Sequence, residues 1–492
     1  MKQKSILAVA FAAMLLLTAC GGGGIQGDMG SPRGDARTTP PREEPSENPS
    51  ENPSESRPEL SFDNPEPTDW PEIPLPDFEY KYEEELQGIV ITKYNGSAGL
   101  VRIPDTLDGE AVVSVGQRAF WENMELTGVY IPNSVNIIAE GAFYGCSSLA
   151  GIIIHENVIE IGMGAFAFCD SLTRVAIPGS VEIIGGGVFG GCKNLTDIFV
   201  SPNNAMYTDR DGVLFSKDMT SVMQVPATRS RFNFPTGVTR IEDGAFGGCA
   251  GLTDIDIPNG VTYIGAGAFR ECTGLTKVVI PNSVETIGGS MFFSGAFSGC
   301  TGLTSVTIGE GVRRIGAWAF RNCTGLTSIT IPDSVTSISD GAFAHCTALT
   351  SVMLGKGLTQ LGTGMIIVAS GGVFYGCTAL SSITIPDGVT IIGQKAFYDC
   401  ISLTSITVPG SANISKESFE GCVGLTEVTI LDGTTEIGEG AFRNCTSLIN
   451  VTIPDSVMVI GYGAFRGCNS LNDESRQRIL SINNDRNYGP FS

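Results

Sequence analysis

Thirteen of the 14 cysteines recur at a regular spacing along the sequence. By residue type and spacing, they are the strongest candidates for chemical function in the chain. Neighbours are mostly about 23 residues apart, but 57 residues separate Cys192 from Cys249. Cysteines can form disulfides, bind metal or act as small buried fillers. An exported protein permits disulfides, but thirteen is odd and the clustered CxxC spacing of a zinc site is absent. We therefore predict free buried thiols. The series is Cys146, Cys169, Cys192, Cys249, Cys272, Cys300, Cys323, Cys346, Cys377, Cys400, Cys422, Cys445 and Cys468.

The remaining sequence gives little support for catalysis. The two histidines, His155 and His345, stand in different repeats, which argues against histidine-based acid–base and zinc chemistry. We find no glycine-rich phosphate loop after a strand, no GxSxG elbow and no HExxH motif. The net charge of −22 argues against nucleic acid as a partner. The sequence therefore predicts no enzyme, no cofactor, no metal site and no nucleic-acid partner.

The cysteines close a repeated unit, of which TGLTSITIPDSVTSISDGAFAHC at 324–346 is a regular copy. In LTSITIP, apolar and small polar residues alternate until Pro332, as in a strand with one buried face. Val335–Ile338 can form a second short strand or an extended turn, and Phe343 is a large residue for the interior. One unit cannot bury these side chains alone, so stacked units must share a continuous core. The chain is predicted to be a β-rich repeat solenoid.

The unit CxxLxxIxIPxxVxxIGxxAFxxC resembles the BspA-like leucine-rich repeat, also called the Treponema type, from about residue 88 to 468. The resemblance implies a curved solenoid with a parallel sheet along one side and short or helical turns on the other. It also implies a cell-surface protein that attaches to host matrix proteins or to other cells. We expect a monomeric rod of this kind.

The first 19 residues are predicted to be an export signal, because Lys2 and Lys4 precede an apolar run too short to span a bilayer. Leu17-Thr18-Ala19-Cys20 resembles the bacterial lipobox, which implies a lipid on Cys20 and a protein anchored at the bacterial surface. An ordinary signal peptide with a chance cysteine and a retained anchor are the alternatives. Residues 20–84, rich in Pro, Gly, Ser and Glu, are predicted to be a disordered acidic spacer. Its Arg33-Gly34-Asp35 matches a weak integrin-type motif that chance also explains.

Three further segments are predicted along the folded chain. Residues 85–123 form an N-terminal cap and the first repeat, with Asn123 in the cysteine slot and a hairpin turn at Asn95-Gly96. Residues 124–468 form the repeats, with insertions near 200–235, 290–294 and 364–370. Asp211-Gly212 predicts a hairpin in the first insertion. Residues 469–492 form a C-terminal cap with a short helix over 471–479 and a loose tail from Asn483.

Two sets of residues are candidates for binding a protein partner. The shorter insertions either emerge on one binding face or pack on neighbouring turns; their candidates are Met291, Phe292, Phe293, Met365, Ile366 and Ile367. The other set follows the strand leucines of the N-terminal repeats, where aromatic and charged residues replace the hydroxyls of later repeats. This set is Tyr130, Ile153, Arg174, Asp197, Phe199, Asp254, Asp256 and Lys277. The function expected is adhesion to host or neighbouring cells, and the alternative is a cell-envelope spacer or assembly protein without a dedicated ligand.

Overall fold

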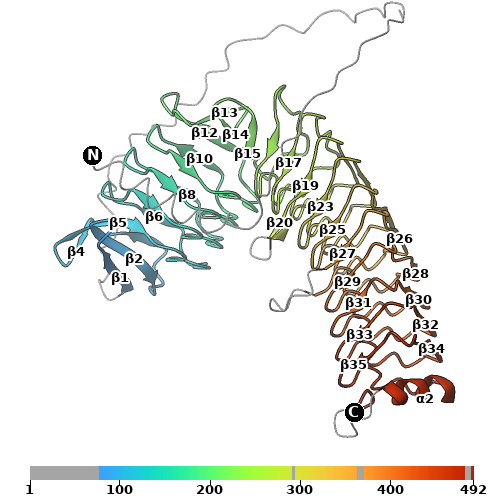
Figure 1. Cartoon of the computed structure of the whole chain (residues 1–492). Helices are drawn as coiled ribbons and strands as arrows, with labels where there is room; N and C mark the ends of the chain where they lie inside the picture. Colours follow the sequence, from blue (N-terminus) through green and yellow to red (C-terminus); the bar gives the residue numbers. More distant parts are fainter. Residues whose placement is uncertain (1–76, 291–293, 363–370, 483–488) are drawn as a thin grey trace, which may run out of the picture. The chain divides into compact units, whose positions relative to one another are not determined.

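Each repeat forms one turn of a three-sided coil, and successive turns lie on top of one another (Figure 1). The computed structural model describes residues 77–290, 294–362, 371–482 and 489–492. It is a β-solenoid of about 16 turns with mostly parallel sheet and very little helix. The predicted repeat solenoid is therefore confirmed.

In most repeats a short strand ends at the isoleucine of the Ile-Gly pair. Together these strands form the most continuous sheet. Thirteen strands are hydrogen-bonded side by side from β13 to β35, and a 7-stranded sheet precedes them. Only one parallel sheet was expected. The sequence left the second segment of each repeat open as a strand or an extended turn, and the structure shows that it forms a second parallel sheet. Its parallel rungs are β5 (Glu110–Val115), β7 (Ile137–Ile138), β9 (Glu160–Ile161), β11 (Ile183–Ile184), β16 (Arg240–Ile241), β17 (Tyr263–Ile264), β19 (Thr286–Ile287), β23 (Arg314–Ile315), β25 (Ser337–Ile338), β27 (Gln360–Leu361), β29 (Ile391–Ile392), β31 (Asn413–Ile414), β33 (Glu436–Ile437) and β35 (Val459–Ile460).

The alternating segment predicted as a strand lies on another side of the coil and forms several short parallel sheets of two or three strands. Ile329 faces the core and pairs with Val352 of the next turn, whereas Ser328 and Thr330 are exposed. These strands are β3 (Leu100–Arg102), β6 (Gly128–Tyr130), β8 (Gly151–Ile152), β10 (Arg174–Ile177), β12 (Asp197–Val200), β18 (Lys277–Ile280), β22 (Ser305–Ile308), β24 (Ser328–Thr330), β26 (Ser351–Met353), β28 (Ser382–Ile383), β30 (Ser405–Val408), β32 (Glu427–Ile430) and β34 (Asn450–Thr452).

The third side carries the phenylalanine and the cysteine of each repeat. Phe320 N–H donates to the carbonyl of Ala342 in the next turn at 2.7 Å. The rings of Phe320 and Phe343 stack with centroids 5.3 Å apart, and Cys346 Sγ donates to the Phe320 carbonyl at 3.1 Å. The thirteen cysteines of the described chain are free and buried. The structure therefore confirms the prediction of buried thiols that satisfy turn backbone groups.

The N-terminal cap begins earlier than predicted. β1 (Phe78–Glu83) is already a strand, and Phe78 is buried against Tyr94 with ring centroids 5.2 Å apart. The spacer boundary at residue 84 was therefore wrong. The hairpin expected at Asn95-Gly96 is also wrong, because β2 (Gly88–Tyr94) pairs in parallel with β5, and β3 pairs with β6. β4 (Thr106–Leu107) forms an antiparallel pair with β5.

The C-terminal cap contains the predicted helix, α2 (Asp473–Ile482), whose Ser475 and Ile479 are buried. Asn472 caps it, since its Oδ1 accepts the N–H of Ser475 at 2.8 Å. A loose tail from residue 483 was predicted, but residues 489–492 return to the last turn, where Phe465 N–H donates to the Pro490 carbonyl at 2.8 Å. Residues 483–488 lie outside the described chain.

The 57-residue step contains an inserted antiparallel sheet. β13 (Tyr207–Arg210) and β14 (Val213–Ser216) form the predicted hairpin about Asp211-Gly212, and β15 (Ser221–Gln224) continues into the long parallel sheet. The buried hydrophobic residues form two clusters that meet here, one from Phe78 to Leu214 and one from Val213 to Ile479. In the second insertion, β20 (Gly289–Ser290) and β21 (Ser294–Gly295) pair antiparallel.

Candidate functional site

The inserted sheet interrupts the hydrogen-bond ladder of the phenylalanine side at one place. In a regular turn, Phe166 N–H donates to the carbonyl of the following turn, at Val188. Phe189 N–H instead donates to the side-chain Oε1 of Gln224 at 3.3 Å. Val225 N–H donates to the Ala245 carbonyl of the next turn at 2.7 Å. The Gln224 side chain also donates to the Val225 carbonyl at 3.2 Å. A buried amide thus joins two turns that no longer pair directly at this point.

Glycines form the surface beside this interruption. Gly244 adopts φ +68°, and a Cβ on it would lie 2.6 Å from the Gly187 Cα. Gly248 adopts φ +81°, and its Cβ would lie 2.8 Å from the Gly191 Cα. Only glycine permits this approach of the two backbones. Two adjacent turns therefore carry no side chain at these positions, and a depression of about 170 Å³ forms over them. We call it the glycine groove; its floor is Gly186, Gly187, Gly190, Gly191, Gly244, Gly247 and Gly248.

Stacked aromatic side chains form one wall of the glycine groove. The rings of Trp121 and Tyr144 are parallel with centroids 4.1 Å apart, and Phe168 follows Tyr144 at 5.1 Å. Arginines cover both ends of this stack, Arg118 at 4.7 Å from the Trp121 ring and Arg270 at 5.0 Å from the Phe168 ring. Phe168 has φ +60°, a conformation unfavourable for a bulky residue. Positive φ recurs at this turn position, as at Glu122 (+54°) and Glu271 (+58°), so it belongs to the repeat turn, and at Phe168 the position carries a ring that lines the groove.

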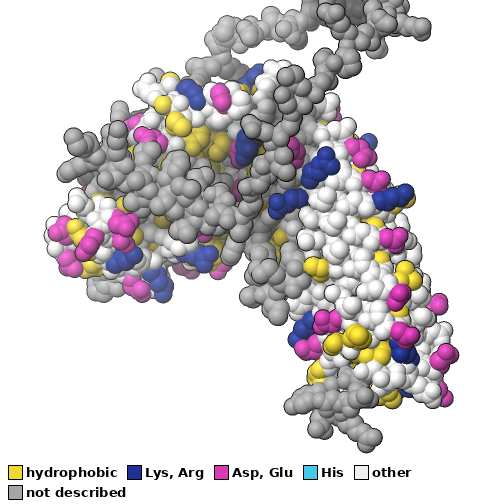
Figure 2. Space-filling model, in the orientation of Figure 1, with side chains coloured by type: hydrophobic (Ala, Val, Ile, Leu, Met, Phe, Trp, Pro, Cys, Tyr) yellow, Lys and Arg dark blue, Asp and Glu magenta, His cyan; other side chains and the backbone are white. Residues whose placement is uncertain are grey.

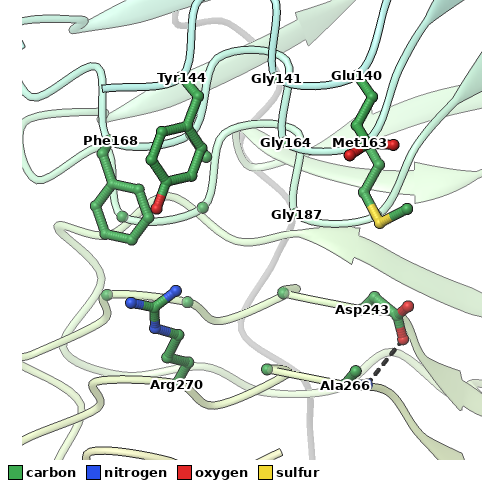
Figure 3. Close-up of a pocket in the computed structure, with 18 of the residues that line it drawn as sticks. Glu140, Gly141, Tyr144, Met163, Gly164, Phe168, Gly187, Asp243, Ala266 and Arg270 are labelled. Atoms are coloured by element: carbon green, nitrogen blue, oxygen red, sulfur yellow. Dashed lines mark hydrogen bonds between the residues drawn. The ribbon is translucent and has the colours of Figure 1, made fainter. Parts of the chain in front are cut away.

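The opposite part of the groove is acidic. Figure 3 shows Tyr144, Phe168 and Arg270 at one end and Glu140, Met163 and Asp243 at the other, with Gly187 between them. Asp243 Oδ1 accepts the hydroxyl of Tyr263 at 3.0 Å and the N–H of Ala266 at 2.8 Å. Burial raises the pKa of Asp243, although both hydrogen bonds oppose the shift.

The arrangement is suited to binding a segment of another molecule. Aromatic rings and arginines are the side chains that contribute most to protein–protein affinity. The glycine floor exposes backbone, so that an extended chain can lie against it without meeting side chains. Arg270 is ion-paired with Glu271 at 2.9 Å, so charges of both signs line the groove and can pair with a polar bound segment.

The predicted strand-face residues do not form one exposed patch. Tyr130 was predicted to face outward, but it is 4% exposed. Its ring lies under the guanidinium of Arg102 at 4.8 Å and beside His155 at 5.6 Å. This prediction was wrong because the preceding strand and the turn after Ile154 cover the tyrosine.

The inserted hairpin lies against two more of the predicted residues, Asp197 and Phe199, which are half-buried. Ile198 between them donates its N–H to the Gly212 carbonyl at 2.9 Å. The other residues of the set are exposed or half-buried, and their role in binding stays a prediction; they are Ile153, Arg174, Asp254, Asp256 and Lys277.

Several predicted residues lie outside the described chain. These are the lipidation candidate Cys20, the motif Arg33-Gly34-Asp35 and the insertion residues Met291, Phe292, Phe293, Met365, Ile366 and Ile367. Their proposed roles remain predictions.

Sequence reasoning missed the glycine groove, although a signal was present. The two repeats on either side of the 57-residue step read IGGGVFGGC and EDGAFGGC, so glycine occupies both outward turn positions in each. The aromatic stack was equally visible, since Trp121 and Tyr144 follow the core phenylalanine in consecutive repeats. What the sequence did not reveal is that the turns of Phe189 and Phe246 are neighbours across the insertion, where Gly191 N–H donates to the Gly247 carbonyl at 3.0 Å.

The fold and the repeats define the chain as a leucine-rich repeat solenoid, and comparison with known proteins gives the family. The family model described as "BspA type Leucine rich repeat region (6 copies)" matches residues 113–222, 227–296, 293–370 and 369–485. The chain belongs to this family. Solenoids of this kind are typically non-enzymatic scaffolds that bind protein partners. None of the curated proteins compared with the chain matches it.

Several solved bacterial structures are similar to this chain. A leucine-rich repeat protein from Eubacterium ventriosum is 24% identical, with 66% of this chain and 92% of that chain covered and a TM-score of 0.50. One from Bacteroides ovatus is 23% identical over 85% and 98% of the two chains, with a TM-score of 0.40. A leucine rich cell surface protein from Faecalibacterium prausnitzii is 29% identical over 72% and 93%, with a TM-score of 0.41.

Within the ranges that the structure covers, no helix is both long and apolar enough to cross a membrane. The same ranges contain no group of three or more His, Cys, Asp or Glu side chains placed to hold a metal ion.

Proposed function

We propose that this chain is an exported bacterial surface protein, anchored by a lipid on Cys20, which binds a protein partner through the glycine groove and thereby supports adhesion. The lipobox-like Leu17–Cys20 supports the anchor. The family supports binding of a protein. The observation that carries the proposal is the groove itself, where stacked aromatic rings, two arginines and exposed backbone converge.

Phe168 offers a test that does not depend on disrupting the core. Because its backbone is left-handed, Phe168→Gly removes the ring and relieves an unfavourable conformation, so the variant is expected to fold. Trp318 is a matched control. It is also an aromatic residue with positive φ, at +57°, and carries an arginine over its ring, but it does not line the groove.

The experiment measures binding of the full chain carrying Cys20→Ala, which prevents lipid attachment, to purified extracellular-matrix proteins. We expect saturable binding to at least one of them at micromolar concentration. Phe168→Gly should weaken it about tenfold, as expected for losing an aromatic anchor, and Trp318→Gly should leave it unchanged. Equal affinity in both variants would refute the groove as the binding surface. No saturable binding would favour a spacer or assembly role instead.

A further inference from the structure

A second concave site lies at the inserted hairpin, away from the glycine groove, and its charge is opposite to that of the chain as a whole. Arg210, Arg229 and Arg231 line a pocket of about 330 Å³ with a single acidic residue, Asp211. The whole chain carries a net charge of −22. We call this site the arginine pocket. Its other lining residues are Val213, Phe215, Phe232, Asn233, Phe234 and Pro235.

Contacts within the chain hold the Arg229 side chain in place, but they do not use all of its N–H donors. Its Nη2 donates to the backbone carbonyl of Asp211 and lies 3.9 Å from the Asp197 carboxylate. Its Nε is buried and has no hydrogen-bond partner within the described part of the chain. A guanidinium has five N–H donors, and a buried donor without a partner is costly. The Arg229 side chain is 35% exposed, so a ligand that brings acceptor oxygens to its accessible N–H groups would add hydrogen bonds to a guanidinium already held in place.

The two other arginines are accessible to a ligand. Arg231 is exposed, and the Arg210 side chain is 63% exposed, with its Nε 3.9 Å from Asp211. That distance exceeds a hydrogen bond, and an exposed pair of this kind contributes little. Both guanidinium groups can therefore turn to a ligand oxyanion, with which arginine forms paired hydrogen bonds.

An apolar wall completes the pocket. Phe232 and Phe234 meet edge to face with centroids 4.9 Å apart, and Phe232 packs on the core ring of Phe246 at 5.1 Å. The loop between residues 231 and 235 is thereby fixed to the core. We propose that the arginine pocket binds a carboxylate attached to an aromatic or apolar group, as at the chain end or acidic side chain of a partner peptide.

The surroundings favour this single carboxylate over a polyanion. Asp197 and Asp211 flank the arginines, and a chain of repeated sulfates would meet them. On the face in Figure 2, the described lysines and arginines are scattered among acidic side chains. A polyanion requires an extended basic strip, whereas one carboxylate requires only the three arginines.

The test compares two probes that differ only at the carboxyl group, N-acetylphenylalanine and its uncharged carboxamide. Ligand-observed NMR titrations use the full chain with Cys20→Ala. We expect saturable binding of the carboxylate, with the carboxamide bound about tenfold more weakly or not at all, because a hydrogen bond to a charged group is lost. Arg231→Gln should weaken the carboxylate about tenfold. Arg314→Gln, which removes an exposed arginine of β23 that does not line the pocket, should have no effect.

Three outcomes would overturn the proposal. They are equal binding of the two probes, an unchanged affinity in Arg231→Gln whose thermal unfolding matches the parent chain, and binding of sulfated polysaccharide in preference to the carboxylate. The inference is independent of the glycine groove, because Phe168→Gly is expected to leave N-acetylphenylalanine binding intact.

Discussion

At the scale of single residues, the cysteine column shows how one slot serves every turn. A thiol at this position donates to the phenylalanine carbonyl of the preceding turn, as Cys323 does to Phe297 at 3.2 Å. Cys249, which follows the insertion, differs and contacts the Val225 and Pro226 carbonyls at 3.9 and 3.7 Å. In the first repeat Asn123 takes the same slot, and its Oδ1 accepts the N–H groups of Glu125 and Leu126 at 3.2 and 3.1 Å. The slot therefore requires a small group that satisfies turn backbone, and neither disulfide nor metal is needed to explain the repetition.

Burial of these thiols makes stability depend on pH in the alkaline range. The pKa of Cys346 rises from its ordinary 9.0 to about 12, chiefly because burial disfavours the thiolate. Below pH 9 the thiol is protonated in both the folded and the unfolded chain, so its contribution is fully present. Between pH 9 and 12 the unfolded chain releases protons that the folded chain keeps, and stability falls by up to about 1.4 kcal/mol per pH unit for each thiol.

Urea unfolding at pH 8 and pH 10.5 would measure this effect. We expect a lower free energy of unfolding at pH 10.5, and a smaller decrease in Cys346→Ala than in the parent chain. The folded Cys20→Ala chain should also resist a thiol reagent at pH 8, whereas all thirteen thiols should react in denaturant. Rapid reaction of a folded thiol would contradict the burial argument.

At the scale of elements, local alternation predicted more than turn preference did. The strand LTSITIP, the hairpin about Asp211-Gly212 and the helix near 473 follow from nearby residues and were predicted. Asn95-Gly96 failed as a hairpin signal because β2 finds its parallel partner in β5, a contact set by stacking. The segment before β1 is rich in proline, and it led to the wrong boundary between spacer and cap. The alternation that marks a strand was present, with aromatic residues at Phe78, Tyr80 and Tyr82.

The glycine groove could not be predicted from local pattern, because it depends on which turns meet across the insertion. Gln224 shows why. Nothing in SVMQV marks this glutamine as the group that replaces a ladder hydrogen bond, yet it is 1% exposed and contacts both sides of the interruption. A buried side-chain amide in a β-strand is a sign of such a role only when its neighbours are known.

Gln224 is therefore expected to contribute strongly to stability. Gln224→Ala leaves the buried Phe189 N–H without its acceptor, and an unsatisfied buried group costs about 1–3 kcal/mol. Chemical denaturation should show a loss of that size. Gln360→Ala is the control, because Gln360 is exposed on β27 of the same sheet and should change stability by less than about 0.5 kcal/mol. Similar effects of the two substitutions would show that the amide does not join the turns.

At the scale of the whole molecule, a solenoid must close the ends of its core. The last phenylalanine of the column, Phe465, has no further repeat to pair with, and the segment 489–492 takes that place. Gly463 N–H donates to the Gly489 carbonyl at 3.2 Å, and Phe491 lies 6.3 Å from the Phe465 ring with Arg476 of α2 over it at 5.5 Å. Four residues thus imitate one side of a missing turn, which protects an otherwise open edge.

Removing residues 489–492 should loosen the last turns without unfolding the chain, because each turn contacts only its neighbours. The N–H groups of Gly463 and Phe465 lose their acceptors, so we expect hydrogen exchange in β33 and β35 to accelerate about tenfold or more, while β16 to β19 keep their protection. Phe491→Ala should produce a smaller change in the same turns, since it removes the ring but not the backbone bonds. Leu480→Ala, at an exposed site on α2, should leave exchange unchanged. Uniform protection after the deletion would mean that α2 alone closes this end of the core.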